Sequence, residues 1–317
     1  MSRLKAWVAA ARLRTLPLSV SGVIVGSSLG LKYLFEQCSE SMFHPDPHCP
    51  DSSNILMSTI FWLAVCTTIG FQVLSNFAND YGDGVKGTDL AREGERRMVA
   101  SGMISPKAMK LGMVITAALT LFLASVLIFM AFGNERFWLA FIFFNLAIAA
   151  VIAAIKYTVG SNAYGYSGKG DIFVFLFFGM LSVLGSYFLF TKSLHWELVL
   201  PASTVGLFSA AVLNLNNMRD IDSDAASGKN TLVVKLGIKK AKVYHYTLVF
   251  FGIASALIYT WLNYERPLQF VYSIAFIPLL VNLIKVYNNK DSRALDSELK
   301  KVALSTFAFA ILFSWLH

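Results

Sequence analysis

Long apolar runs separated by short polar segments dominate the chain. Nine of these runs are close to 20 residues, which is the length that crosses a bilayer as an α-helix. Because unpaired backbone groups are too costly in hydrocarbon, the pattern predicts an all-α integral membrane protein, with residues 1–317 forming one membrane-embedded domain. We expect the nine transmembrane helices at residues 16–35, 55–79, 109–132, 137–158, 171–190, 197–218, 243–262, 268–286 and 302–316.

Charge sets the expected orientation of these helices. If the N-terminus lies in the cytoplasm, all but four of the 27 Lys and Arg residues fall on the cytoplasmic side; the exceptions are Lys32, Arg136, Lys192 and Arg266. Cytoplasmic loops of membrane proteins carry such an excess. We therefore expect a multi-pass protein of the cell (inner) membrane with its N-terminus in the cytoplasm and its C-terminus outside.

Composition supports the membrane assignment and excludes a nucleic-acid partner. Hydrophobic residues make up 56% of the chain and charged residues only 15%, more apolar surface than a soluble core needs. The net charge of +8 is scattered between apolar runs instead of gathering on one water-facing domain. The partner implied by composition is the lipid bilayer.

Small and sulfur-containing residues carry two further expectations. Gly22, Gly26 and Gly30 recur every four residues along the first span, which allows a neighbouring helix backbone to approach closely. Cys38 and Cys49 flank a polar, Pro-rich loop, where a disulfide and free thiols both remain open.

Acidic and amide side chains gather at the cytoplasmic ends of the second and sixth spans. The first cluster contains Asn79, Asp80 and Asp83, and the second contains Asn216, Asp220 and Asp224; the loops that carry them extend over about 80–108 and 219–242. If the helices continue through these clusters, residues four apart share one face. Oxygen-only ligands favour a hard cation, so the clusters predict Mg²⁺, and two clusters on either side of a diphosphate suit two ions.

Basic and polar residues beside the clusters could hold phosphate oxygens. These candidates for substrate binding are Asn76, Asn79, Lys86, Arg92, Arg96, Arg97, Asn216 and Lys229. Positive-inside topology is the alternative for the cations, and helix capping is the alternative for single acids such as Asp89 and Asp222. Acidic residues in spans also mark ion pathways, so a cation- or proton-coupled transporter is the alternative from another class.

These clusters resemble the two motifs of the UbiA-type intramembrane prenyltransferase superfamily, NDxxDxxxD and DxxxD. Asn79, Asp80 and Asp83 match the first motif except at its last acidic position, which is Gly87, with Asp89 two residues later; Asp220 and Asp224 match the second. The segments RLRTLPLS at 12–19, YGYSGKGDIFVFLFFG at 164–179 and NNMRDIDSDAASGKNTLVVKLG at 216–237 resemble the branch that acts on 1,4-dihydroxy-2-naphthoate in menaquinone synthesis.

The resemblance implies a nine-helix bundle and a Mg²⁺-dependent reaction. In it, Asn79, Asp80, Asp83, Asp220 and Asp224 would hold the metal ions, and the four aspartates would draw pyrophosphate from a polyprenyl diphosphate. The aromatic acceptor would attack the resulting allylic cation and lose CO₂, giving a demethylated menaquinol. An acceptor such as 4-hydroxybenzoate or homogentisate is the alternative within this class.

Four further residues are candidates for contact with the reacting molecules. Tyr81 and Tyr157 lie near cytoplasmic ends, where a ring could stabilise the cation or anchor the interface. Asp171 opens the fifth span and matches the superfamily's GD segment, so it could act as a base, orient the acceptor or cap its helix. Arg14 could pair with the acceptor's carboxylate, although topology also explains it.

Overall fold

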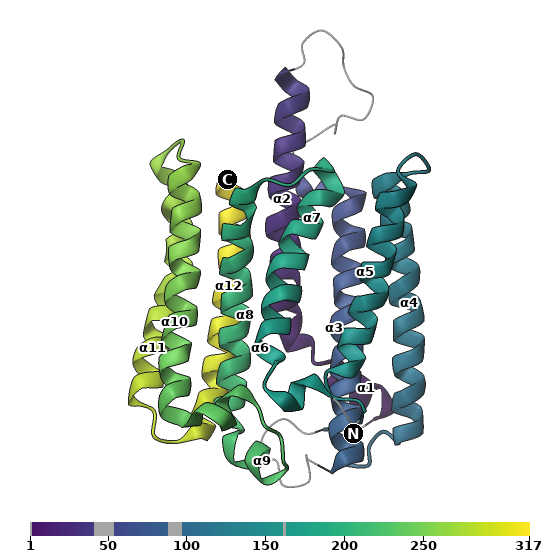
Figure 1. Cartoon of the computed structure of the whole chain (residues 1–317), viewed down its shortest axis with the longest axis vertical. Helices are drawn as coiled ribbons and strands as arrows, with labels where there is room; N and C mark the ends of the chain where they lie inside the picture. The colour runs from purple at the N-terminus through teal and green to yellow at the C-terminus, as the bar shows by residue number, and fades with distance from the viewer. Residues whose placement is uncertain (1, 41–53, 88–96, 161–162) are drawn as a thin grey trace.

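The computed structural model describes residues 2–40, 54–87, 97–160 and 163–317. These residues form helices and connecting turns, with no β-strand among them. Figure 1 shows long helices that run side by side in one bundle. Within the described ranges, nine helical segments are long and apolar enough to cross a membrane, which confirms the predicted number of spans.

The helices alternate in direction along the chain. Their bounds are α1 Arg3–Ala11, α2 Leu16–Glu40, α3 Thr59–Lys86, α4 Pro106–Phe132, α5 Phe137–Lys156, α6 Gly170–Val174, α7 Ser182–Thr191, α8 Val199–Arg219, α9 Ile221–Ala226, α10 Leu232–Leu262, α11 Ile277–Asn288 and α12 Asp296–Leu316. A π-helical segment, η4 (Phe175–Leu181), joins α6 to α7. Short 3₁₀ segments are η1 Leu13–Thr15, η2 Ile55–Met57, η3 Tyr164–Ser167, η5 Trp196–Leu198, η6 Pro267–Phe276 and η7 Ser292–Leu295.

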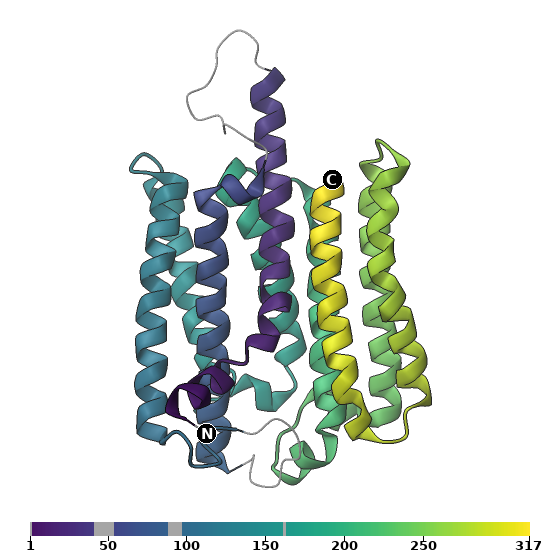
Figure 2. The ribbon, with the colours of Figure 1, turned by 180° about the vertical axis from the view of Figure 1, so that it is seen from behind.

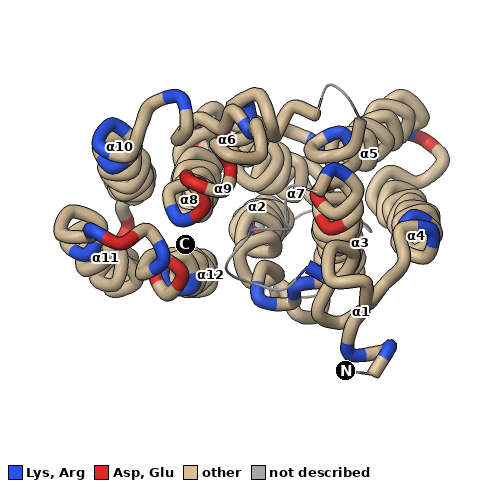
Figure 3. The backbone as a smooth tube through the Cα atoms, turned by 90° about the horizontal axis from the view of Figure 1, so that it is seen from below, with Lys and Arg blue, Asp and Glu red and all other residues tan. Residues whose placement is uncertain are grey.

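The two ends of the chain lie at opposite ends of the bundle, as an odd number of spans requires (Figure 1). The end that carries the N-terminus also carries α9 and the turn before α12. Figure 3 looks at this end and shows acidic positions on α3 and, across from them, on α8 and α9. Which end faces the cytoplasm stays a prediction from the distribution of Lys and Arg.

The glycines of α2 allow the closest helix contact in the bundle. A Cβ atom at Gly26 would lie 2.1 Å from the carbonyl oxygen of Val183, and one at Gly22 would lie 2.6 Å from that of Phe178. Only a residue without a side chain permits this approach of α2 to η4 and α7. The expectation of close backbone packing is therefore confirmed.

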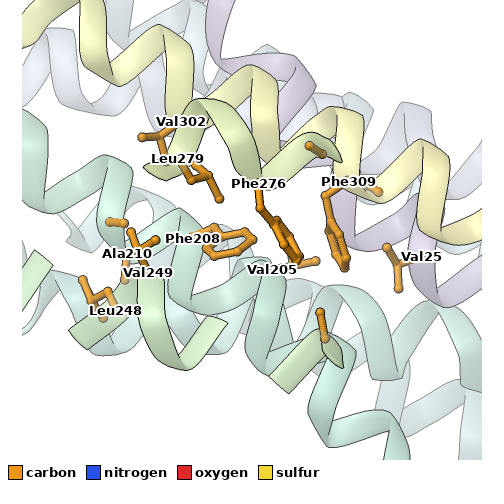
Figure 4. Close-up of a cluster of buried hydrophobic side chains, with 14 of the residues drawn as sticks. Val25, Val205, Phe208, Ala210, Leu248, Val249, Phe276, Leu279, Val302 and Phe309 are labelled. Atoms are coloured by element: carbon orange, nitrogen blue, oxygen red, sulfur yellow. The ribbon is translucent and has the colours of Figure 1, made fainter. Parts of the chain in front are cut away.

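Aromatic packing joins the helices on the other side of α2. Figure 4 shows Phe208 of α8, Phe276 of η6 and Phe309 of α12 in one buried cluster. The ring centroids of Phe276 and Phe309 lie 5.7 Å apart, and those of Phe208 and Phe276 lie 5.9 Å apart. Figure 2 shows α12 beside α2, so this cluster links the C-terminal helices to the centre of the bundle.

The helix that carries the first acidic cluster continues beyond its membrane span. Ser58 caps the start of α3 by accepting a hydrogen bond from the Phe61 N–H at 3.3 Å. The helix then runs through Asn79 and Asp83 to Lys86 and ends at Gly87, whose φ of 72° lies in the left-handed region. Gly87, which replaces the last acid of the superfamily motif, thus serves as the helix terminator.

The second acidic cluster does not lie on one continuous helix. α8 ends at Arg219, Asp220 adopts φ −96° and ψ 11°, and α9 begins at Ile221. The expectation of an unbroken helical face through Asp220 is wrong. Asp222 of α9 nevertheless is exposed while Asp224 is buried, as their two-residue separation predicts.

The expectation for the loop disulfide falls partly outside the described residues. Cys38 at the end of α2 is disulfide-bonded, whereas Cys49 lies outside the described ranges. Cys66 of α3 is a free cysteine.

Candidate active site

A polar cavity of about 350 Å³ opens at the end of the bundle that carries the N-terminus and α9. It lies between α3, α8, α12 and the start of α2, so that it collects residues far apart in the sequence. Nine predicted site residues line it: Arg14, Asn79, Asp83, Arg97, Tyr157, Asn216, Asp220, Asp224 and Lys229. The two acidic clusters therefore face a common space, as two clusters on either side of one diphosphate require.

Asp83 of the first cluster lies between two basic side chains. Its Oδ2 atom lies 3.3 Å from Nη2 of Arg97, and its Oδ1 atom lies 3.1 Å from Nζ of Lys229. Lys229 also lies 3.9 Å from Oδ1 of Asp224, which belongs to the second cluster. One ammonium group thus stands between carboxylates of both clusters.

Tyr166 of η3 connects the same two clusters. Its hydroxyl donates a short hydrogen bond to Asp83, and its ring centroid lies 3.9 Å from Nζ of Lys86 and 5.0 Å from Nζ of Lys229. Its carbonyl oxygen accepts a hydrogen bond from the Asn230 N–H at 3.0 Å. From the sequence, Tyr166 is a candidate only for stabilising a cation or for anchoring the interface, and its hydrogen bond to Asp83 is not predicted.

The second cluster is organised by Arg219, which sequence reasoning also missed. The Nε and Nη2 atoms of Arg219 donate to both carboxylate oxygens of Asp220, at 2.7 and 2.9 Å. Nη2 also donates to Asn216 at 2.9 Å, and Nη1 donates to Asp296 of α12 at 2.5 Å. Both Arg219 and Asp220 are buried, so this pairing offsets charges that water does not solvate.

Asp80 has a different position from the one expected of a metal ligand. Its two carboxylate oxygens accept hydrogen bonds from the backbone N–H groups of Val99 and Met98, at 2.8 and 3.0 Å. It is only 1% exposed and does not line the polar cavity. Asp80 therefore anchors the turn that follows Arg97 and does not share the position of Asp83.

Three other predicted substrate-binding residues lie outside the polar cavity. Asn76 donates to the Ala11 carbonyl at 2.8 Å and so ties α1 to α3. Lys86 donates to the Thr158 carbonyl at 3.0 Å, and Tyr81 packs in an apolar cluster beside α1. These residues support the site from its edge.

Asp171 is also buried and lines neither this cavity nor the apolar one described next. The predicted cations Arg92 and Arg96, together with Asp89, lie outside the described residues.

An apolar cavity of about 360 Å³ joins the polar one. Both are lined by Gln72, Asn79, Tyr157, Val174, Phe178 and Leu213. Burial raises the pKa of Tyr157, one residue beyond α5, and the nearby Asp171 carboxylate raises it further. Tyr157 therefore stays a neutral phenol at the junction.

The apolar cavity extends between α3, α5 and α7. On α5, its wall consists of Ala147, Ala150, Ala153 and Ala154, followed by bulkier residues toward the start of the helix. Phe143 lines that end, and its ring stacks on Phe188 with 5.5 Å between the centroids. This long apolar space next to a charged one suits a lipid-like anion, with its head in the polar cavity and its tail along α5.

The donor chemistry of the polar cavity fits a hard divalent cation. Asp83 and Asp224 offer carboxylate oxygens from opposite sides, with a cationic ammonium group between them, and Asn79 and Asn216 add amide oxygens to the same lining. In the described ranges, no three His, Cys, Asp or Glu residues lie close enough to form a ready-made metal cage.

The fold and the site define a membrane-embedded protein whose charged cavity adjoins an apolar one. Residues 49–314 match the UbiA prenyltransferase family, and the chain belongs to that family. The chain is therefore a prenyltransferase, and the transporter alternative does not hold.

Curated relatives agree over nearly the full length of the chain. A Haemophilus influenzae protein named 1,4-dihydroxy-2-naphthoate octaprenyltransferase is 39% identical, over 98% of this chain and 95% of that protein. An Escherichia coli protein of the same name is 36% identical, over 99% of this chain and 95% of that protein.

Solved structures share the fold at low sequence identity. A UbiA homolog from Archaeoglobus fulgidus bound to DMAPP and Mg²⁺ has a TM-score of 0.60 and 14% identity, covering 97% of this chain and 99% of that one. A structure described as digeranylgeranylglyceryl phosphate synthase has a TM-score of 0.57 and 17% identity, covering 99% of this chain and 98% of that one. Both likenesses support the nine-span bundle.

Proposed function

We propose that the protein transfers a polyprenyl group from a polyprenyl diphosphate to 1,4-dihydroxy-2-naphthoate, releasing pyrophosphate and CO₂ and giving a demethylated menaquinol. The observation that carries this proposal is that the polar cavity, lined by carboxylates of both motifs, shares Asn79 and Tyr157 with an adjacent apolar cavity. The names of the relatives support the naphthoate acceptor and the prenyl donor.

The diphosphate would lie in the polar cavity between Asp83 and the second cluster. When bound there, Mg²⁺ neutralises the developing negative charge of the leaving group. Asp83, Asp220 and Asp224, with Asn79 and Asn216, would hold the ions, whereas the backbone contacts of Asp80 argue against its inclusion. Arg97 and Lys229, which already reach Asp83, can move their hydrogen bonds to phosphate oxygens.

The prenyl tail would follow the apolar cavity along α5. From Tyr157 to Phe143 the helix advances about 21 Å at 1.5 Å per residue. An isoprene unit adds roughly 5 Å to an extended chain, from four carbon–carbon bonds of about 1.5 Å, so the tunnel accommodates about four units. Among the described large apolar residues of this lining, Leu146 alone is more than a third exposed, at 38%, so a longer tail would enter the bilayer beside it.

The reaction itself needs a dry, oriented site. Breaking the bond between the allylic carbon and the diphosphate oxygen leaves the electron pair on pyrophosphate. The resulting cation forms where Asn79 and Tyr157 line both cavities, and the neutral Tyr157 ring can stabilise it. The acceptor carbon that bears the carboxylate then bonds to the cation, and the carbon–carboxylate bond breaks to release CO₂ and restore the aromatic ring.

The acceptor would enter the polar cavity from the side of η1 and α12. Arg14, Arg12 and Lys300 line that part of the cavity. Guanidinium groups pair well with carboxylates, so Arg14 is the proposed partner of the acceptor's carboxylate. From the positive-inside rule, we further propose that this cavity faces the cytoplasm in a cell (inner) membrane.

The test is a transfer assay with purified protein, a polyprenyl diphosphate and a set of acceptors, followed by mass spectrometry of the products. We expect a prenylated and decarboxylated product from 1,4-dihydroxy-2-naphthoate with Mg²⁺, and no product with EDTA. Transfer only to 4-hydroxybenzoate or homogentisate would refute the naphthoate assignment. Full activity in EDTA would refute the metal assignment.

A further inference from the structure

Asp296 lies outside both acidic motifs but reaches the second one through a shared arginine. It is the first residue of α12, far along the chain from Asp220, and it lines the polar cavity. Its Oδ1 atom accepts from Nη1 of Arg219 at 2.5 Å, while Nε and Nη2 of Arg219 contact the two oxygens of Asp220. Arg219 is therefore shared between two carboxylates.

The charges of this group decide how it meets a cation. Arg219 and Asp220 alone would form a neutral pair, and a neutral pair attracts a divalent ion weakly. Asp296 adds a second negative charge, which leaves one net negative charge on the three side chains together. Asp296 is also the exposed member, with a side chain 53% accessible, whereas Arg219 and Asp220 are each 5% accessible.

The geometry also gives Arg219 a second partner when Asp220 binds an ion. The helix break at Asp220 means that a continuous α-helix does not fix its side chain, and the bidentate contact with Arg219 does so instead. An incoming cation competes with Arg219 for the oxygens of Asp220. When Arg219 gives up one oxygen of Asp220 to the cation, its hydrogen bond to Asp296 keeps the guanidinium in place.

We propose that Asp296 is a positioning residue for the second motif, which acts through Arg219 to hold Asp220 oriented toward a divalent cation and adds one negative charge to the group. This inference rests on the proposed metal-dependent function and extends it to a residue beyond the two motifs. In this proposal Asp296 acts through its contact with Arg219.

The test compares Asp296→Asn, Asp296→Glu and Asp222→Asn in the full-length protein. Asn keeps an oxygen that can accept from Arg219 but removes the charge, and Glu keeps the charge. Asp222 is an exposed acid of α9 outside the cavity lining, so its change removes the same charge without touching Arg219. The readout is Mn²⁺ affinity by electron paramagnetic resonance with pyrophosphate present, which needs no turnover.

We expect Asp296→Asn to weaken Mn²⁺ binding about tenfold, the order of effect for one partly screened charge near a divalent ion. Asp296→Glu and Asp222→Asn should stay within about twofold of the unchanged protein by the same reasoning.

Unchanged Mn²⁺ affinity in Asp296→Asn would overturn the proposal, and so would an equal loss in Asp222→Asn. If the unchanged protein bound no Mn²⁺ with pyrophosphate, the metal-dependent function itself would fail, which separates the two claims. In turnover assays, Asp296→Asn should raise the Mg²⁺ concentration for half-maximal rate and leave the rate at saturating Mg²⁺ nearly unchanged. A loss of rate that saturating Mg²⁺ does not restore would also contradict the proposal.

Discussion

Asp80 and Asp83 are three residues apart on α3, yet the structure predicts opposite consequences for their replacement by asparagine. Asp80 accepts two backbone hydrogen bonds at 2.8 and 3.0 Å and is 1% exposed. An asparagine there keeps one acceptor oxygen and turns an NH₂ group toward the second backbone donor. Asp83 faces the polar cavity with Lys229 and Arg97, where its charge is available to a cation.

The size of the Asp80 effect follows from its bonds. A hydrogen bond to a charged group contributes about 1.5–3 kcal/mol, so losing one and facing an unpaired donor should cost about 2–3 kcal/mol. For a chain of this size, that corresponds to a fall in Tm of roughly 3–5 °C. Asp83→Asn should instead reduce Mn²⁺ affinity by at least about tenfold, because a carboxylate ligand is lost.

The assay measures both quantities on each variant: Tm from tryptophan fluorescence of detergent-purified protein, and Mn²⁺ affinity with pyrophosphate. Asp80→Asn should lower Tm and keep Mn²⁺ affinity within about threefold, since no ligand charge is removed from the cavity. The reasoning is refuted if Asp80→Asn keeps its Tm and loses Mn²⁺ binding to the same extent as Asp83→Asn. Asp80 would then be a ligand, as the motif alone predicts.

Three further changes test the close packing of α2, the contact of Tyr166 with Asp83, and the proposed exit of the prenyl tail beside Leu146. Gly26→Ala should lower the yield of monodisperse protein in size-exclusion chromatography. Gly185→Ala is the control and should not lower it, because its Cβ would lie 3.8 Å from the nearest atom. Equal yields would contradict the close approach of α2. Tyr166→Phe should lower kcat/KM for the donor up to about tenfold, because one hydrogen bond to a charged group is lost. Tyr166→Leu should lower it further, because the ring is lost as well. Equal losses in both variants would show that the ring has no role. Leu146→Trp should slow transfer from donors longer than about four isoprene units relative to geranyl diphosphate. Ile142→Trp, one turn away and outside the cavity lining, should not. A uniform effect on all donors would argue against an exit at Leu146.

The spans could be predicted from the sequence because lipid imposes one solution on a long apolar run. The nine predicted runs correspond to the nine helical segments of the described residues. Their ends were less predictable. α3 continues to Lys86 and ends at Gly87. α10 begins at Leu232, where Thr231 caps it, and Gly237, with φ 74° and ψ 159°, breaks it before the apolar run at 243.

The site could be predicted in part, since paired acids at the ends of two spans indicate where charge must be compensated. Asp83, Asp220 and Asp224 do line one cavity. Spacing could not separate Asp80 from Asp83, because the difference lies in the backbone donors of Met98 and Val99, which no periodicity reveals. Nor could it find Asp296, whose link to Arg219 depends on how α12 packs beside α8.

The central claim is that the joined cavities couple loss of pyrophosphate to decarboxylation of a naphthoate acceptor. The most direct measurement uses protein in nanodiscs with Mg²⁺, a polyprenyl diphosphate and carboxyl-labelled 1,4-dihydroxy-2-naphthoate, and counts prenylated product, pyrophosphate and labelled CO₂. The account predicts equal amounts of all three, and none of them from Asp83→Asn. Prenylated product that retains the label, or pyrophosphate release without transfer, would contradict it.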